Sequence, residues 1–169
     1  SSIERVVVPS IEGGTDWSPA LQTIDTVVHL AARVHVMSEN TVDPLAAFRS
    51  VNTEVTLNLA RQAAQAGVKR FVFISSAKVN GESTQSMKPF KPDDISSPLG
   101  AYAVSKWEAE QGLLQISAAT GMEVVIIRPP LVYGPGVKAN FASLMRAVQR
   151  GWPLPFGAVH NQRSFLALD

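Results

Sequence analysis

The chain of 169 residues carries 15 Lys and Arg against 14 Asp and Glu, and its formal net charge of +1 gives no reason to expect a nucleic acid or an anionic membrane as a partner. Its hydrophobic content of 46% is enough for one core of ordinary domain size, but no run approaches the ~20 apolar residues of a membrane span. The lack of cysteine excludes disulfides and thiolate metal sites, and the first residues lack the basic and apolar regions of a signal peptide, so we expect a cytoplasmic domain.

Four short runs along the chain are rich in β-branched or aromatic residues and are nearly continuous in apolar character rather than alternating. Continuous apolar runs are typical of strands that are covered on both faces of a parallel sheet. The predicted strands are Arg5–Val8, Thr26–Leu30, Arg70–Ser75 and Glu123–Arg128.

Segments with helical periodicity lie between these runs. Apolar residues recur at threes and fours over 45–63, and Gly67 follows as the expected C-cap. A second helix is predicted to begin near Ser97-Pro98, with the serine as N-cap, and to end at Gly121, and a third covers roughly 140–150. Strands that alternate with helices predict βαβ units and a doubly wound, parallel α/β sheet.

The segment 81–98 carries three prolines and two adjacent aspartates without clear periodicity. It is predicted to form a long loop between the strand that ends at Ser75 and the helix that follows. Ligands of open α/β sheets bind at the carboxyl edge of the strands, so this loop is a candidate lid or substrate wall.

Chemistry is indicated by Ser76, which follows an apolar strand, and by Tyr102 and Lys106, which are four residues apart on a predicted helix. Positions four apart lie on one face of a helix, so the two side chains project together. An ammonium beside a phenol favours the phenolate and lowers a pKa that starts near ~10, which makes the tyrosine usable as a general acid and base. Taken alone, this spacing occurs by chance in many helices, and a surface Tyr102 with Lys106 paired to Glu110 is the simpler interpretation.

No metal site is predicted from the histidines. His29, His35 and His160 are separated in the sequence, and no carboxylate cluster lies at ligand spacing.

The strand-end Ser76, the helical Tyr102-Ala-Val-Ser-Lys106 and the stretch Arg128-Pro-Pro-Leu-Val-Tyr-Gly-Pro-Gly136 together resemble the short-chain dehydrogenase/reductase superfamily, in its extended NAD-dependent epimerase/dehydratase branch. The resemblance implies a Rossmann-like fold in which Ser76, Tyr102 and Lys106 are the catalytic residues. It also implies that Lys106 holds the ribose of the nicotinamide.

The same resemblance implies contacts with NAD and with a nucleotide sugar. Cofactor contacts are implied for Leu30, Ala31, Ala32, Ser75, Tyr102, Lys106 and Pro130. Substrate contacts are implied for Ser76, Ala77, Asn140, Phe156 and Arg163. Side chains larger than alanine at 31–32 would push the cofactor away, and a guanidinium fork at Arg163 suits a diphosphate, although a solvated charge is the alternative there. Asn52 matches an asparagine of a family helix, and a polar residue that satisfies a neighbouring backbone group is an equal alternative.

Two departures from the family pattern affect the expected fold. At Pro9-Ser10-Ile11 the family usually has Gly-Asp and an aliphatic residue, so serine weakens or removes the expected contact with the adenine. No Gly-rich dinucleotide turn occurs in the sequence, and the chain begins at what resembles the third strand of a nucleotide-binding fold. We therefore expect a Rossmann-like sheet that is incomplete at both ends. Residues 1–135 are assigned to the central part of an NAD(P)-binding domain and residues 136–169 to the start of a nucleotide-sugar-binding region.

The resemblance implies a UDP-hexose 4-epimerase that acts by transient hydride transfer to NAD, with NADP as the alternative cofactor. It also implies a homodimer through the helices over 51–63 and 102–114. A dehydratase is less favoured, because Ala77-Lys78 stand where dehydratases typically carry an Asp-Glu pair. The same residues are compatible with a nicotinamide-dependent reductase and with a non-catalytic fragment of such an enzyme.

Overall fold

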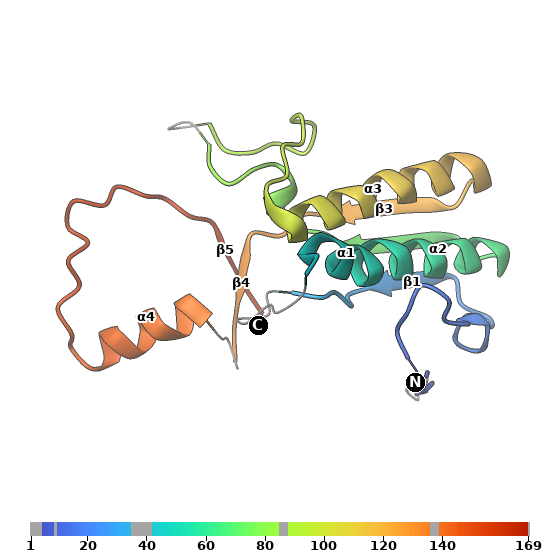
Figure 1. Ribbon diagram of the computed structural model, residues 1–169, viewed down its shortest axis with the longest axis horizontal. Helices are drawn as coiled ribbons and strands as arrows, with labels where there is room; N and C mark the ends of the chain where they lie inside the picture. The colour runs from blue at the N-terminus through green and yellow to red at the C-terminus, as the bar shows by residue number, and fades with distance from the viewer. Residues whose placement is uncertain (1–4, 9, 35–41, 85–87, 136–138, 169) are drawn as a thin grey trace. The chain divides into compact units, whose positions relative to one another are not determined.

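The computed structural model describes residues 5–8, 10–34, 42–84, 88–135 and 139–168 (Figure 1). The chain divides into two compact units, Ser1–Arg128 and Pro129–Asp169. The predicted boundary at residue 135 falls inside the second unit. None of the helices in the described ranges is both long enough and apolar enough to cross a membrane.

The first unit contains a parallel sheet of three strands. These are β1 (Thr26–His29), β2 (Arg70–Ile74) and β3 (Glu123–Ile127), in the order β1-β2-β3. Phe71 of β2 lies opposite Val27 on one side and opposite Val124 on the other. The parallel α/β sheet is therefore confirmed, and the strands agree with the predicted runs to within a residue at their ends.

The predicted first strand, Arg5–Val8, is wrong. These residues have no regular structure, and Val7 is 82% exposed. An apolar run becomes a strand only when a neighbouring strand satisfies its N–H and C=O groups. Arg5–Val8 makes no ladder pair with any strand in the described part of the chain.

The first crossover is a nearly continuous helical segment. It consists of α1 (Pro44–Arg49), a π-helical turn (Ser50–Val55) and α2 (Thr56–Gln65), and it begins with an Asp43 carboxylate that accepts from the Ala46 N–H at 3.0 Å. It ends as predicted around Gly67, whose φ of +81° suits a glycine. There the Val68 N–H donates to Ala63 O and the Gly67 N–H to Ala64 O, which is the Schellman pattern.

The second crossover carries α3 (Gly100–Thr120), which ends at Gly121 with φ of +77°, as predicted. Its predicted start is wrong, because the N-cap is Leu99 rather than Ser97. The Ser97 N–H donates to Val79 O at 3.1 Å, and this bond fixes Ser97 in the loop rather than at the helix end.

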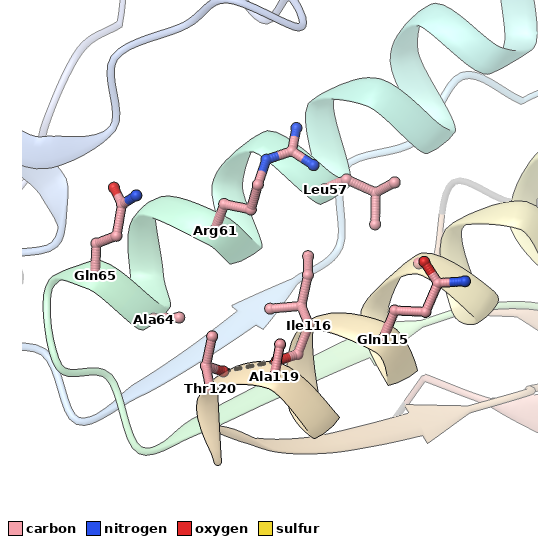
Figure 2. Close-up of a pocket in the computed structure, with 9 residues that line it drawn as sticks. Leu57, Arg61, Ala64, Gln65, Gln115, Ile116, Ala119 and Thr120 are labelled. Carbon is pink, nitrogen blue, oxygen red and sulfur yellow. Dashed lines mark hydrogen bonds between the residues drawn. The ribbon is translucent and has the colours of Figure 1, made fainter.

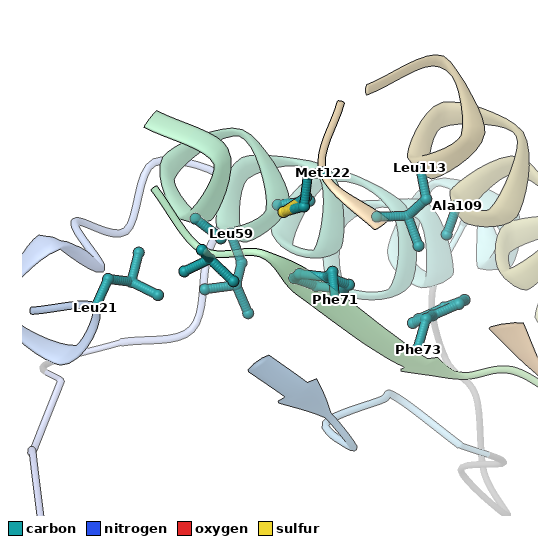
Figure 3. Packing of buried hydrophobic residues seen from close by; sticks show 10 residues of the cluster. Leu21, Leu59, Phe71, Phe73, Ala109, Leu113 and Met122 are labelled. Atoms are coloured by element: carbon teal, nitrogen blue, oxygen red, sulfur yellow. The ribbon is translucent and has the colours of Figure 1, made fainter. Parts of the chain in front are cut away.

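The core of this unit lies between the sheet and helices α2 and α3. Phe71 and Phe73 of β2 are fully buried against Leu59 of α2 and against Ala109 and Leu113 of α3 (Figure 3). Sequential strands joined by crossovers of one hand place their helices on the same face of the sheet. The opposite face is uncovered in the ranges that the structure describes: Val28 is 56% exposed and Ile127 is 44% exposed.

The second unit contains a short parallel pair, β4 (Leu131–Tyr133) and β5 (Phe165–Ala167), with α4 (Ala139–Gln149) between them in sequence. The helix was predicted, but the two strands were not. Tyr133, Phe141 and Phe165 form an aromatic cluster with ring centroids 5.1 to 6.2 Å apart. This cluster joins the helix to the strand pair.

Candidate active site

Ser76 and Tyr102 meet at the carboxyl end of β2. Ser76 lies two residues beyond this strand, in extended backbone, and caps the short helix Ala77–Val79. Tyr102 lies in the first turn of α3, and the Ser76 side chain lies near enough to its hydroxyl to influence its pKa. The Tyr102 ring packs edge-on against the Phe48 ring of α1, with the two ring centroids 6.1 Å apart. Two residues that are far apart in the sequence thus lie close together.

The expected low pKa of Tyr102 is not found. Burial raises the pKa of Tyr102 above its ordinary value of 10.0, and the hydrogen bond with Ser76 acts in the opposite direction. The expectation that Lys106 would lower this pKa is therefore wrong for this arrangement. The reason is that the ammonium of Lys106 is directed to another partner.

Lys106 is buried under the sheet edge and is only 1% exposed. Its Nζ donates to Ile74 O at 2.6 Å and lies 4.0 Å from the centre of the Phe73 ring. Burial lowers the pKa of Lys106 from 10.5 to about 8, and the charge of Glu110 partly offsets this effect. A buried cation with a lowered pKa at the end of a strand is unusual for a purely structural lysine.

The simpler interpretation, a surface tyrosine and a Lys106–Glu110 pair, is also wrong. Tyr102 is half-buried. Glu110 is fully buried and pairs with Arg128, which donates from Nε at 3.0 Å and from Nη2 at 2.6 Å. Glu110 also accepts from the Ser75 hydroxyl at 2.5 Å. The predicted cofactor residue Ser75 is therefore engaged within the protein.

A small pocket of about 250 Å³ opens beside Tyr102. Its walls come from α1, from the segment after β2 and from the start of α3. They are Phe48, Lys78, Glu82, Leu99, Gly100, Ala101, Tyr102 and Ala103. Lys78 and Glu82 form an exposed ion pair of 3.2 Å on this wall. Tyr102 is thus one of the side chains that line this pocket.

The segment after β1 contains three of the predicted cofactor residues. Leu30 is 71% exposed, Ala31 is exposed and Ala32 is half-buried. The buried Asn52 holds the end of this segment, because its Oδ1 accepts from Arg33 N at 2.8 Å and its Nδ2 donates to Arg33 O at 3.1 Å. The same Nδ2 donates to Ser105 Oγ at 3.0 Å. Asn52 thus satisfies neighbouring polar groups and also ties the end of β1 to α3.

The remaining predicted site residues are less constrained. Ala77 is half-buried beside Ser76. Pro130, Phe156 and Arg163 belong to the second unit, where Pro130 is half-buried, Phe156 is 54% exposed and Arg163 is exposed. The side chain of Asn140 lies outside the described residues.

The structure gives no support to a metal site. In the ranges that it describes, no group of three or more His, Cys, Asp or Glu residues can hold a metal ion. His29 is buried, lies 3.0 Å from Thr56 Oγ1 through Nε2 and stacks on Phe73. This histidine is thus engaged with neighbouring side chains of the protein, and His35 lies outside the described residues.

The polar network around Arg128 was not predicted from the sequence. This guanidinium contacts Glu110, Asn80 Oδ1 at 3.2 Å and Ser96 Oγ at 3.3 Å. These four residues are dispersed in the sequence. The sequence gives only a weak indication of the pair between Glu110 and Arg128. Glu110 lies on the predicted helix, four positions after Lys106, and Arg128 ends a predicted strand.

The chain is similar to proteins of a known family. The model of the NAD dependent epimerase/dehydratase family matches residues 10–169. A UDP-glucose 4-epimerase of Vibrio cholerae is 53% identical over 163 residues, which are 96% of this chain and 50% of that protein. A GDP-6-deoxy-D-mannose reductase of Pseudomonas aeruginosa is 36% identical over 129 residues, covering 75% of this chain and 42% of that protein.

A solved structure shows the same relationship in three dimensions. It is a UDP-glucuronic acid 4-epimerase from Bacillus cereus in complex with UDP-glucuronic acid and NAD, with a TM-score of 0.75 and 29% identity. The match covers 91% of this chain and 49% of that one. The chain thus spans about half the length of the relatives that it matches.

Proposed function

The chain belongs to the NAD dependent epimerase/dehydratase family, and we propose that the polypeptide that contains it is a UDP-hexose 4-epimerase. The proximity of Ser76 and Tyr102, one helical turn from the buried Lys106, carries this proposal. The 53% identity to a UDP-glucose 4-epimerase supports the substrate class. The absence of cysteine is compatible with the reducing cytoplasm, where we propose that the protein works.

The residues at the strand ends fit a nicotinamide dinucleotide. Ala31 and Ala32 leave the backbone after β1 open to close approach, and Tyr102 and Lys106 lie at the end of the neighbouring β2. We propose that Leu30, Ala31 and Ala32 contact the cofactor and that Lys106 and Tyr102 hold its ribose. NAD, when bound, supplies a hydride acceptor that later returns the hydride.

The chemistry of this chain's own residues is proton transfer at the sugar. Tyr102 accepts the proton of the sugar C4 hydroxyl during oxidation and returns it to the keto oxygen during reduction. Ser76 donates a hydrogen bond to the same oxygen. Burial raises the pKa of Tyr102, so proton abstraction requires a positive charge near the phenol to lower it again. We propose that Lys106, one helical turn away on α3, supplies this charge when its ammonium leaves Ile74 O in the complex with NAD and the sugar.

Turnover of UDP-glucose to UDP-galactose tests the proposal. We expect the longest natural polypeptide that contains these residues to catalyse the conversion with NAD and without net consumption of NAD. Tyr102→Phe should lower kcat by about 10²–10⁴-fold, because it removes the proton-transfer group and keeps the ring. Wild-type turnover in the Tyr102→Phe protein would contradict the assignment.

A reductase is the second candidate function, because a GDP-6-deoxy-D-mannose reductase is 36% identical to part of this chain. A reductase consumes one reduced cofactor per product, whereas an epimerase regenerates its cofactor. Absorbance of the reduced nicotinamide during turnover separates the two. We expect no activity from the 169-residue chain alone, because no Gly-rich turn is available within it to hold the pyrophosphate.

We also propose that the protein is a homodimer that pairs through α2 and α3. A groove of about 430 Å³ runs between these helices (Figure 2). Leu57, Ala64 and Ile116 line it, with Arg61 and Gln115 also among the lining residues. Gly112 allows α2 and α3 to approach each other closely at this groove, because a Cβ at this position would lie 2.5 Å from Leu57 Cδ2.

A charged substitution in this groove tests the dimer. Ala119 is exposed and lines the groove, so Ala119→Arg should leave the fold intact and place two like charges at the interface of two copies. Light scattering should then show a dimer for the wild-type protein and a monomer for the variant. A monomeric wild-type protein at high concentration would refute the pairing.

A further inference from the structure

Arg128 lies where three parts of the first unit meet. It follows β3, which ends at Ile127, and its guanidinium contacts Glu110 of α3 together with two residues of the loop after β2. Nη1 donates to Asn80 Oδ1 at 3.2 Å, and Nη2 donates to Ser96 Oγ at 3.3 Å. A single planar group therefore bridges the helix and both ends of the loop.

Glu110 provides a fixed anchor for this guanidinium. Its side chain is fully buried, and it accepts two bonds from Arg128 and one from the Ser75 hydroxyl. Bidentate pairs of arginine and carboxylate fix orientation as well as distance. Glu110 lies two helical turns from Tyr102 on α3. The loop residues that Arg128 contacts are therefore fixed relative to the helix that carries the tyrosine.

The two ends of the loop are also joined to each other. Asn80 is buried, and its Nδ2 donates to Lys91 O at 3.2 Å, while the Ser97 N–H donates to Val79 O at 3.1 Å. Asn80 stands between Lys78 and Glu82, which form one wall of the pocket beside Tyr102. The position of that wall therefore depends on the bond between Asn80 and Arg128.

We propose that Arg128 is a positioning residue that, anchored on Glu110, fixes the Lys78–Glu82 wall of the substrate pocket relative to Tyr102. The inference rests on the proposed function for the identity of the substrate. That Arg128 holds the ends of the loop does not depend on the proposed function. Lysine cannot replace Arg128, because one ammonium cannot reach the carboxylate, Asn80 and Ser96 with the geometry of a planar fork.

The first test is amide hydrogen exchange at Ser97, measured without substrate in the longest natural polypeptide that contains the chain. Arg128→Lys and Asn80→Ala should each accelerate this exchange about tenfold, because each removes hydrogen bonds that hold the loop ends. Arg49→Lys is the matched control. Arg49 also forms a close double contact with a carboxylate of α3, that of Glu108, but on the surface and away from the loop.

The second test is steady-state turnover of UDP-glucose. Arg128→Lys and Asn80→Ala should raise KM about ten- to thirtyfold and change kcat by less than about threefold, because the pocket wall is displaced while Tyr102 is retained. Asn80→Asp keeps an acceptor for Arg128 and should recover most of the loss seen with Asn80→Ala. Arg49→Lys should keep the wild-type KM.

The outcomes separate this inference from the proposed function. An unchanged Ser97 exchange rate or an unchanged KM in both Arg128→Lys and Asn80→Ala would overturn the positioning role. A fall in kcat alone would also overturn it. A wild-type protein with no turnover of UDP-glucose would refute the proposed substrate, and Ser97 exchange would still decide whether Arg128 holds the loop.

Discussion

Replacing Lys106 with methionine should make the protein more stable at neutral pH while it abolishes turnover. Burial lowers the pKa of Lys106 from 10.5 to about 8, which means that the folded protein holds the proton less tightly than the unfolded chain does. Folding is therefore penalised at all pH values below about 8. The penalty declines as the pH rises from about 8 toward 10.5, where the unfolded chain also loses the proton.

The size of the effect follows from these values. The difference between 10.5 and about 8 corresponds to about 3 kcal/mol at pH 7. Methionine has a similar length and no charge, but it loses the bond to Ile74 O and the contact with the Phe73 ring. These losses cost about 1–2 kcal/mol. We therefore expect a net stabilisation of about 1–2 kcal/mol in Lys106→Met at pH 7.

Urea unfolding at two pH values provides the assay. Between pH 7 and pH 9.5 the wild-type protein should gain about 2 kcal/mol relative to Lys106→Met, because only the wild-type protein is relieved of a buried charge. Lys69→Met is the control, since Lys69 is exposed and pairs with Asp25 on the surface at 2.8 Å. The stability of Lys69→Met should stay close to that of the wild-type protein at both pH values. A Lys106→Met protein that is less stable than wild type at pH 7, with the same pH dependence, would refute this reasoning.

Three further substitutions probe the same unit by urea unfolding. Asn52→Ala removes three buried hydrogen bonds to Arg33 and Ser105 and should cost about 2–4 kcal/mol, and a loss below about 1 kcal/mol would contradict their importance. Burial lowers the pKa of His29 from 6.5 to about 4. The free energy of unfolding should therefore fall as the pH drops below 6.5, because the unfolded chain then binds a proton that the folded protein does not. Between pH 7.5 and pH 5.5 the wild-type protein should lose about 1 kcal/mol more than His29→Gln, and parallel curves would argue against a neutral buried imidazole. Gly121→Ala places a Cβ at φ of +77° and should cost about 1 kcal/mol. No loss would mean that the helix end rearranges.

Local patterns predicted most of the secondary structure correctly. Three apolar runs became β1, β2 and β3, because each was long enough and rich enough in β-branched or aromatic residues to prefer extended backbone. Gly67 and Gly121 ended helices, because a positive φ there favours glycine. The fourth run, Arg5–Val8, failed because a strand also needs a partner, and partners are a property of the fold.

The sequence by itself determined which residues could form the site, and the tertiary structure decided their electrostatics. The four-residue spacing of Tyr102 and Lys106 is enough to place them on one helix face, and the apolar run before Ser76 is enough to place it at a strand end. The structure places Ser76 and Tyr102 near one another, and their assignment as site residues stays a prediction. The pKa of Tyr102 moved opposite to the expectation, because burial depends on what packs around a side chain. The attachment of Arg128 to Glu110 and the loop was likewise not predictable, since hydrogen bonds between residues 18 to 48 positions apart arise only when the chain has folded.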